Sequence, residues 1–263
     1  MFRACLMLAA LAARLASGAA PAYSSDSILN GADFAPGPFA PNSFVTIFGT
    51  DLSYYTASLP QGTTMTALPY ELGNVRVYVN NYSAPLIYVC PTQINLLVPG
   101  NLKPGTVPLY VVRQSVRGPD AMITLAPAAP QLFATGDGRV IAQHADYSLI
   151  TADSPARPEE TIVVYAAGLG PTEPNPAPGE FPAYPYQIAG SLTVSLDGSA
   201  LPRESIKYAG VTPGSPGVYQ INLLLPATLG ANPEIRASMG DQTSRKGVIL
   251  PAQPPQPSPD QPR

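Results

Sequence analysis

The sequence predicts an all-β protein made of two tandem immunoglobulin-like β-sandwich domains. Short apolar segments alternate with turn residues, one unit of the chain is repeated, and no stretch keeps apolar residues at helical spacing. The 263 residues include 33 prolines and 22 glycines. Because proline costs about 3 kcal/mol inside a helix, short strands joined by many turns are expected, with under about 10% helix.

The composition includes enough apolar residues to form a core and few charged residues. Apolar residues make up 45% of the chain and charged residues 12%, which is about half the usual share. The formal net charge is −3. Since a nucleic-acid partner needs a basic face for its phosphates, we expect no nucleic-acid partner.

The first twenty residues have the order of a secretory signal. Arg3 precedes the apolar run 4–13, and small residues follow at 16–20. Arg14 interrupts the run and leaves it too short to span a bilayer. We predict a signal peptide over 1–20, cleavage between Gly18 and Ala22, a secreted or cell-surface protein and no membrane span after cleavage. An uncleaved anchor is the alternative.

Cleavage would remove Cys5 and leave Cys90 as the single cysteine, so no disulfide within the mature chain is expected. Cys90 follows the apolar run 86–89. We interpret it as a small buried hydrophobic residue at a strand end. A nucleophilic cysteine would need a base, and the chain has one histidine, His144.

The body of the chain contains one unit twice. The segment 93–99 (QINLLVP) recurs as 220–226 (QINLLLP), and two upstream landmarks recur in the same order, 44–52 with 162–170 and 73–80 with 190–197. The repeat predicts a first domain over 26–127 and a second over 131–250. A stretch rich in proline and alanine, 126–130, would join them.

Each unit is predicted to consist of strands in a fixed order. Val75, Val77 and Val79 alternate with polar or larger residues, which is the period-2 pattern of a half-buried strand, and 192–197 repeats it. The turn residues that follow these two strands are Asn80-Asn81 and Asp197-Gly198. Later strands are expected over 107–112, 121–125, 235–238 and 247–250.

The repeated Gln-x-Asn strand predicts a core position in each unit. Ile94 and its counterpart Ile221 would face the core, and the amides of Gln93 and Asn95 would lie on the opposite side. These amides could tie the strand to a neighbouring loop, because each donates and accepts hydrogen bonds. The functional alternative is that they line a ligand site.

The segments 43–52, 84–95, 155–158 and 165–172 also carry a family resemblance. The first (SFVTIFGTDL) resembles the opening strand and turn of IPT/TIG domains, which have an immunoglobulin-like fold. Together the segments look like an uncharacterised family of secreted bacterial proteins, in which the paired module often ends longer extracellular chains. The resemblance covers roughly residues 27–250. It implies an immunoglobulin-like fold and an extracellular or cell-surface setting in bacteria, and it brings no catalytic residues.

Known catalytic and metal-binding motifs are missing from the sequence. It has no Gly-x-Ser-x-Gly, His-Glu-x-x-His or Cys-x-x-Cys motif. His144 could orient with Asp146 or Asp153, but a solvated or strand-end histidine is the simpler interpretation. Asp137, Asp146 and Asp153 do not have the spacing of a calcium loop. Glu159-Glu160 is interpreted as a solvated strand start. We therefore expect no enzyme, cofactor or metal site.

Two long inserts at equivalent places in the repeat are the candidate binding segments. Loops of nearly 20 residues are uncommon and often functional, and tyrosines next to prolines lose little entropy on binding. The inserts run over 53–72 and 171–189. The candidate ligand-binding residues are Tyr54, Tyr55, Tyr70, Phe181, Tyr184 and Tyr186. The alternative is that these rings cover the sandwich edge and the seam between the domains.

The remaining segment, 251–263, has six prolines in thirteen residues and is predicted to be a disordered tail. Three functions stay open. The first is a non-catalytic extracellular binding or adhesion module that recognises a glycan or a protein. The second is a structural spacer or assembly unit of the cell surface. The third is an unrecognised hydrolase, which should show clustered carboxylates in a cleft.

Overall fold

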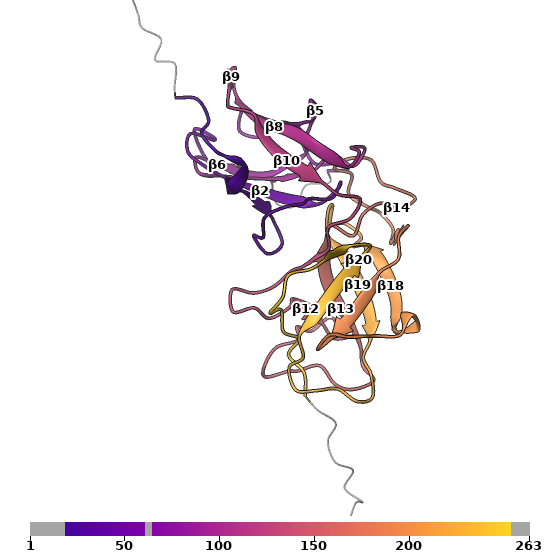
Figure 1. The fold of residues 1–263 in the computed structure, drawn as a ribbon. Helices are drawn as coiled ribbons and strands as arrows, with labels where there is room; N and C mark the ends of the chain where they lie inside the picture. The colour runs from indigo at the N-terminus through magenta and orange to yellow at the C-terminus, as the bar shows by residue number, and fades with distance from the viewer. Residues whose placement is uncertain (1–18, 61–64, 254–263) are drawn as a thin grey trace, which may run out of the picture.

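The computed structural model describes residues 19–60 and 65–253, and in these ranges the protein is all-β. Two β-sandwich domains follow one another along the chain, and the first and last described residues lie at opposite ends of the pair (Figure 1). Two short 3-10 turns, η1 (Ser25–Ser27) and η2 (Arg203–Ser205), are the only helical segments described. The predicted fold class is confirmed. The predicted signal peptide lies almost entirely outside the described residues.

The first sandwich consists of two antiparallel sheets. One sheet has the order β1-β2-β7-β6-β3, and the other has the order β10-β8-β4-β5, with β9 pairing with β8. Their strands are β1 (Ile28–Asn30), β2 (Phe44–Phe48), β3 (Ala57–Ser58), β4 (Val75–Val79), β5 (Tyr82–Ser83), β6 (Leu86–Cys90), β7 (Gln93–Leu97), β8 (Gly105–Arg113), β9 (Val116–Arg117) and β10 (Ala121–Leu125).

The second sandwich repeats this plan. Its sheets have the orders β11-β13-β19-β18-β15-β14, with β12 pairing with β13, and β17-β16-β20-β21. Their strands are β11 (Gln131–Leu132), β12 (Ala142–Gln143), β13 (Thr161–Ala167), β14 (Thr172–Glu173), β15 (Gln187–Ile188), β16 (Thr193–Leu196), β17 (Ser199–Ala200), β18 (Ile206–Val211), β19 (Tyr219–Leu224), β20 (Ile235–Met239) and β21 (Gln242–Thr243).

Alternation along the strands places one side of each sheet in a core. Val75, Val77 and Val79 are fully buried, as their spacing predicts, and Ile94 and Ile221 are 0% and 1% exposed. One core cluster is drawn from residues 28–125 and the other from 128–252. The predicted register of the Gln-x-Asn strand is therefore confirmed.

Strand pairing shifts the alignment of segment 44–52 with segment 162–170 by one residue. Ile94 pairs with Ile47 and Ile221 pairs with Val164. Val45, and not Phe44, is therefore the counterpart of Ile162, and both are fully buried. The segment 247–250 is also not the strand expected. It makes only isolated bridges, from Ile249 to Arg139 and Glu234.

Both ends of the folded part differ from the prediction. Ala22 exchanges two backbone hydrogen bonds of 2.9 Å with Thr50, so the folded chain begins before residue 26. At the other end, Pro251 and Ala252 are buried, and the Gln253 N–H donates to Ala156. The first three residues of the predicted tail are thus docked, and 254–263 lies outside the described residues.

The two domains meet through apolar packing and through the inserts. Phe44 and Phe133 stack edge to face with ring centroids 6.3 Å apart. A Cβ on Gly217 would lie 2.4 Å from Leu97, so glycine allows domain 2 to cover the outer face of β7 closely. This contact explains why Leu97 is 2% exposed although it lies opposite the core.

Replacing Ile94 or Ile221 with alanine is expected to lower the free energy of unfolding by about 2–5 kcal/mol, since each side chain leaves a core cavity. Urea unfolding followed by tyrosine fluorescence would measure the loss. Thr193→Ala, on the exposed side of β16, is the control. A loss below about 0.5 kcal/mol for both isoleucine variants, the range of surface substitutions, would contradict the described cores.

Raising the pH is expected to destabilise domain 1 through Tyr23. Its hydroxyl donates to the Pro119 carbonyl at 2.6 Å and accepts from the Val111 N–H at 2.7 Å, and burial raises its pKa from 10.0 to about 12. Above pH 10 the unfolded phenol loses its proton while the folded one keeps it, so stability falls as the pH rises towards 12.

The urea midpoint of the wild type should therefore decrease over this pH range, and that of Tyr23→Phe should decrease less steeply. Tyr147→Phe, at a ring that is 74% exposed, serves as the control. Equal slopes for all three proteins would contradict the assignment to Tyr23.

Candidate functional site

The two inserts that the sequence marks as candidate binding segments touch one another across the domain boundary. The Leu68 N–H donates to Gly179 at 2.8 Å, and the Phe181 N–H donates to Thr66 at 2.9 Å. Ala67 and Glu180 form the antiparallel bridge between these two bonds. The later half of the first insert is thus paired with the second insert.

The candidate aromatic residues fall into separate places. Tyr54 lies under the Arg113 guanidinium, 4.0 Å from the ring centroid, and the Tyr55 hydroxyl accepts from Asn74 at 3.3 Å. Both rings are about half exposed at the end of domain 1 where the insert starts. Tyr70 is 44% exposed and donates to the Pro178 carbonyl at 3.0 Å, which joins the two inserts.

The candidates of the second insert differ in exposure. Phe181 is half-buried at the insert pairing, and Tyr186 packs against the core of domain 2. Tyr184 is 68% exposed. The structure therefore does not gather the six rings into one surface, and only Tyr70 lines the groove described next.

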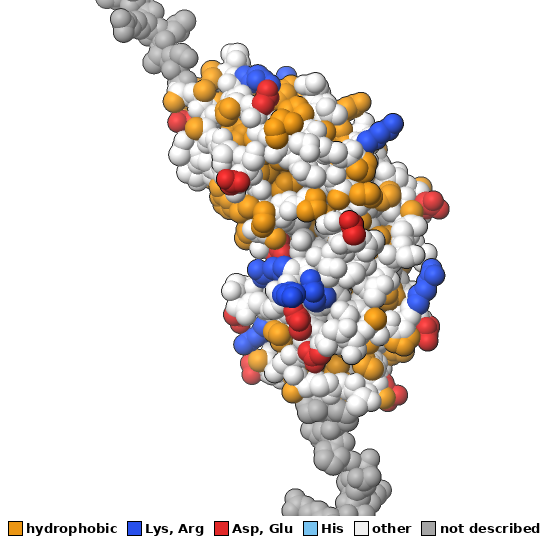
Figure 2. Space-filling view, viewed as in Figure 1, with side chains coloured by type: hydrophobic (Ala, Val, Ile, Leu, Met, Phe, Trp, Pro, Cys, Tyr) orange, Lys and Arg blue, Asp and Glu red, His pale blue; other side chains and the backbone are white. Residues whose placement is uncertain are grey.

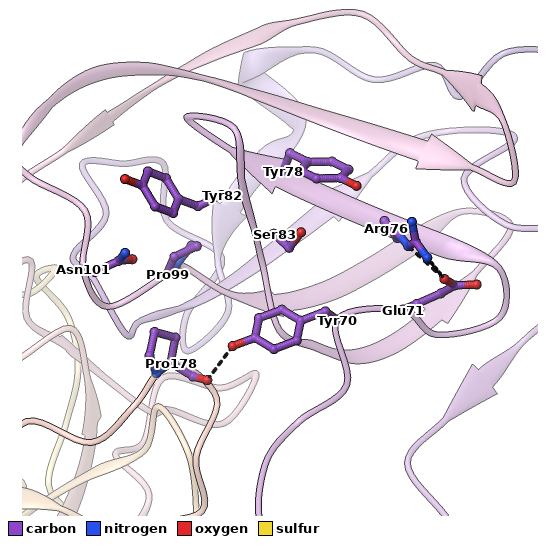
Figure 3. A pocket seen from close by; sticks show the side chains of 9 residues that line it. All are labelled: Tyr70, Glu71, Arg76, Tyr78, Tyr82, Ser83, Pro99, Asn101 and Pro178. Carbon is purple, nitrogen blue, oxygen red and sulfur yellow. Dashed lines mark hydrogen bonds and ion pairs between the residues drawn. The ribbon is translucent and has the colours of Figure 1, made fainter.

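A groove of about 490 Å³ lies beside the insert pairing (Figure 3). Tyr78 and Tyr82 lie on one side, and Tyr70 and Pro178 lie on the other. Its lining residues are Tyr70, Glu71, Arg76, Tyr78, Tyr82, Ser83, Pro99, Asn101 and Pro178. Three tyrosines and two prolines make its surface mainly apolar, and amide, hydroxyl and charged groups stand at intervals between them.

Tyr78 is held in place by a stack of side chains on the outer face of the β4/β8 pair. Its ring lies 4.9 Å from that of Tyr110 at an angle of 17°, and the Arg117 guanidinium lies 4.0 Å from the Tyr110 centroid on β8. Arg117 in turn pairs with Asp120 at 2.5 Å. This support restricts the ring of Tyr78 to one position, and a ring that is already fixed loses little entropy in any contact it makes.

The two charged residues of the groove, Arg76 and Glu71, neutralise each other. Arg76 Nη2 lies 2.5 Å from a carboxylate oxygen of Glu71, and Arg76 Nε donates to the same oxygen at 2.8 Å. Arg76 is the only cation among the residues that line the groove in the described part of the chain. The pair can offer N–H donors and carboxylate acceptors without presenting a net charge.

Five lining residues of the groove were not predicted from the sequence, namely Tyr78, Tyr82, Arg76, Ser83 and Asn101. A local signal existed for two of them, because Arg76 and Tyr78 occupy outward positions of a strand whose valines are buried. Tyr110 alternates with buried Leu109 and Val111 in the same way. Nothing local indicates that Tyr70 and Pro178, 108 residues apart, close the opposite side.

The repeated amides bond along their own strand and not to a neighbouring loop. Gln93 Nε2 donates to Asn95 Oδ1 at 2.8 Å, and Gln220 Nε2 donates to Asn222 Oδ1 at 3.2 Å. In domain 1 the Thr46 hydroxyl donates to the same Asn95 oxygen at 3.1 Å. The expected tie to a loop is therefore wrong, and these amides lie outside the groove.

His144 lies at a strand end, as one of the two simple interpretations expected, but its pairing with Glu160 was not predicted. His144 is 8% exposed at the end of β12, and its Nδ1 lies 2.5 Å from Glu160 Oε1. The partner is thus neither Asp146 nor Asp153, and Glu160 is not a solvated strand start. Glu160 also accepts from the Arg157 N–H at 3.0 Å, so it ties a loop to the start of β13.

Ser154 completes an arrangement that resembles a Ser-His-Glu triad, with its hydroxyl 3.2 Å from His144 Nε2. The same nitrogen lies 3.1 Å from the Ser154 carbonyl oxygen. A proton on Nε2 would bond to this carbonyl, whereas a general base needs Nε2 unprotonated to take the hydroxyl proton. We interpret the cluster as a structural tie between the 144–154 loop and β13.

Cys90 is partly exposed, which differs from the buried position expected. Its sulfur lies 3.6 Å from the Thr92 hydroxyl at the end of β6. Burial raises the pKa of the thiol, but hydrogen bonds with Thr92, Tyr88 and Gln93 together outweigh burial and lower the pKa. Within residues 19–60 and 65–253, no three histidine, cysteine or carboxylate side chains are grouped as a metal site. The same ranges contain no helix of the length and apolarity that a membrane span requires.

Comparisons with known proteins assign no family. No family model matches the chain, and no curated protein matches it. A surface glycan-binding protein of Prevotella bryantii is 13% identical over 88% of this chain and 42% of its own, with a TM-score of 0.28. A surface glycan-binding protein of the mixed-linkage glucan utilization locus of Bacteroides ovatus is 8% identical over 81% and 44%, with a TM-score of 0.32.

Domains 5–6 of the S-layer protein SbsC are 10% identical over 88% of this chain and 99% of that chain, with a TM-score of 0.27. The chain spans less than half the length of the two glycan-binding proteins. TM-scores of this size and identities this low identify no relative, and they assign neither a ligand nor a function.

Replacing Glu160 with alanine is expected to lower the free energy of unfolding by about 1–3 kcal/mol, because the buried His144 loses a charge-assisted hydrogen bond. Glu159→Ala is the matched control, since the neighbouring carboxylate is exposed. Urea unfolding would measure both. Equal stabilities of the two variants would contradict the structural role of the pair.

Proposed function

We propose that this protein is a non-catalytic extracellular binding module whose groove takes a carbohydrate chain. The observation that carries the proposal is the groove itself, where three tyrosine rings alternate with groups that donate and accept hydrogen bonds. Sugar rings have apolar C–H faces and hydroxyl edges, so they are complementary to such a lining. Aromatic side chains offer large contact areas at low entropic cost.

The polar groups of the groove are placed to read hydroxyl groups. Asn101 and Ser83 each donate and accept, and the Arg76–Glu71 pair offers both functions side by side. In Figure 3 the Arg76–Glu71 pair lies at one end of the groove and Asn101 near the other, with Ser83 between them. A chain of sugar units running between these ends would meet polar groups at both ends and rings along its path.

The charge distribution favours an uncharged sugar chain. Arg76 is paired with Glu71, and Arg117 behind the aromatic stack is paired with Asp120. A carboxylate or sulfate on a ligand would have to displace these carboxylates or lie near them. Figure 2 shows charged side chains scattered singly or in mixed groups over the visible face, whereas hydrophobic side chains gather on the upper domain and at the domain junction.

The structural spacer remains a second candidate function, and the insert pairing favours it. Backbone hydrogen bonds between the inserts, the Phe44–Phe133 contact and the Arg245–Asp33 ion pair at 3.6 Å all cross the domain boundary. Such a joint would hold the two sandwiches at a fixed angle. A spacer would keep this joint and bind no sugar.

Tyr82→Ala is expected to reduce affinity for a bound oligosaccharide by tenfold or more, because an aromatic anchor contributes about 2 kcal/mol. Tyr78→Ala should act similarly, and Tyr78→Phe should keep most of the affinity because the ring and its stack remain. A glycan array would select the ligand, and isothermal titration calorimetry would measure its affinity.

Tyr147→Ala is the control, because this ring is 74% exposed and lies in domain 2 away from the groove. Binding that survives both Tyr78→Ala and Tyr82→Ala would mean that the groove is not the site. An array without any bound glycan would favour the spacer.

A further inference from the structure

A second cavity lies at the end of domain 2 beside the segment that joins the domains. Its volume is about 400 Å³, and its walls come from Ala128, Pro171, Gly190, Met239 and Asp241 among others. It shares no residue with the groove of domain 1. We call it the end cavity. Comparison with the equivalent place in domain 1 shows why the space exists.

Strand registers identify the equivalent residues. Val77 pairs with Val111 in domain 1, and its counterpart Val194 pairs with Ala237 in domain 2. Two residues further along β8 and β20, Arg113 therefore corresponds to Met239. The Gly118 N–H bonds to Val111 just as the Ser244 N–H bonds to Ala237, which supports the same alignment.

A second set of equivalent residues follows from β2 and β13, which occupy the same place in the two domains. Because Ile47 and Val164 are equivalent, Leu52 corresponds to Leu169, and both are fully buried. Two residues later, Tyr54 corresponds to Pro171. Domain 2 thus has a methionine and a proline where domain 1 has an arginine and a tyrosine.

In domain 1 this place is filled by the chain's own guanidinium. Arg113 is 1% exposed, and it donates from Nη1 to the Asp51 carbonyl at 2.6 Å and from Nη2 to the Ala19 carbonyl at 2.5 Å. The Asp51 carboxylate lies 3.5 Å away, and Tyr54 covers the planar face at 4.0 Å. Carbonyls, one carboxylate and a flat apolar surface therefore hold the cation.

Domain 2 has neither the cation nor the groups that hold it in domain 1. The counterpart of Asp51 is Gly168, whose carbonyl accepts from the Ala129 N–H at 2.8 Å, and the counterpart of Tyr54 is Pro171. The walls of the end cavity are mainly apolar. The segment that joins the domains lies close to the Gly170-Pro171 turn, since a Cβ on Gly170 would lie 2.9 Å from the Pro127 carbonyl oxygen. Asp241 brings a carboxylate to the rim, and it makes no ion pair within the described part of the chain.

We propose that the end cavity binds the side chain of an arginine presented by an extracellular polypeptide. The guanidinium would lie in the space beside Met239, the counterpart of Arg113, with its stem along Met239 and Pro171 and its charge towards Asp241. Arginine fits better than lysine because its planar group packs on flat apolar surfaces and donates in several directions. A compact ammonium loses more hydration in an apolar cavity.

Titration of the isotope-labelled exported chain with N-acetyl-arginine methylamide, followed by NMR, tests the proposal. Saturable shifts are expected for the amides of Gly190, Gly240 and Asp241, with a dissociation constant in the millimolar range. The lysine analogue should bind at least several-fold more weakly. The uncharged norleucine analogue should cause no saturable shift there.

Two variants complete the test. Met239→Arg places domain 1's own side chain in the cavity and should abolish binding, and Asp241→Asn at an exposed turn should weaken it at least threefold. Asp153→Asn, at an exposed carboxylate elsewhere in domain 2, should bind like the wild type. Absent shifts in the wild type, equal binding of the lysine or norleucine analogue, or unchanged binding by Asp241→Asn would overturn the proposal. If Met239→Arg does not fold, the Asp241 variant and the lysine analogue still decide.

Discussion

The pairing of the two inserts is the contact on which the arrangement of this molecule depends. Backbone hydrogen bonds join Leu68 to Gly179 and Thr66 to Phe181, and the Tyr70 hydroxyl adds a bond to Pro178. Gly179 makes the approach possible, because it has φ +77° and a Cβ there would lie 2.8 Å from Pro85. This pairing sets domain 2 against domain 1 and supplies one side of the groove.

The groove follows from the same contact together with the shape of the domain 1 sheet. β5 has only two residues, so the edge of its sheet ends early and leaves the outward tyrosines of β4 and β5 beside the insert. Tyr78 is supported from behind by Tyr110 and Arg117, and Tyr70 is fixed from the front by Pro178. Side chains held on both sides are suited to binding a ligand without reordering.

The internal repeat conserves the cores and varies the ends of the sandwiches. Buried positions such as Ile94 and Ile221 keep their type, since a change of volume in a packed core costs several kcal/mol. At the sandwich end, Arg113 and Tyr54 in one copy are replaced by Met239 and Pro171 in the other. The same framework therefore has a filled site in domain 1 and an open cavity in domain 2.

The sequence by itself determined the fold class, the repeat and most of the strands. These features depend on period-2 alternation and on turn residues, which are local and can be read along the chain, as at Val75, Val77 and Val79. The same local pattern predicted the burial of Ile94 and Ile221. It failed at 247–250, where backbone pairing is too irregular to form a strand.

Only the tertiary structure decided which residues form sites. Tyr70 meets Pro178 and His144 meets Glu160 because strands bring distant loops together, and no periodicity encodes such pairs. Tyr54, Tyr55 and Tyr184 share a residue type with the groove tyrosines, but none of the three lines the groove. Local chemistry specifies which way a side chain faces on its strand. Which other side chains it meets depends on how the strands and the two domains pack, because such contacts join residues separated along the chain, by 16 positions for His144 and Glu160 and by 108 for Tyr70 and Pro178.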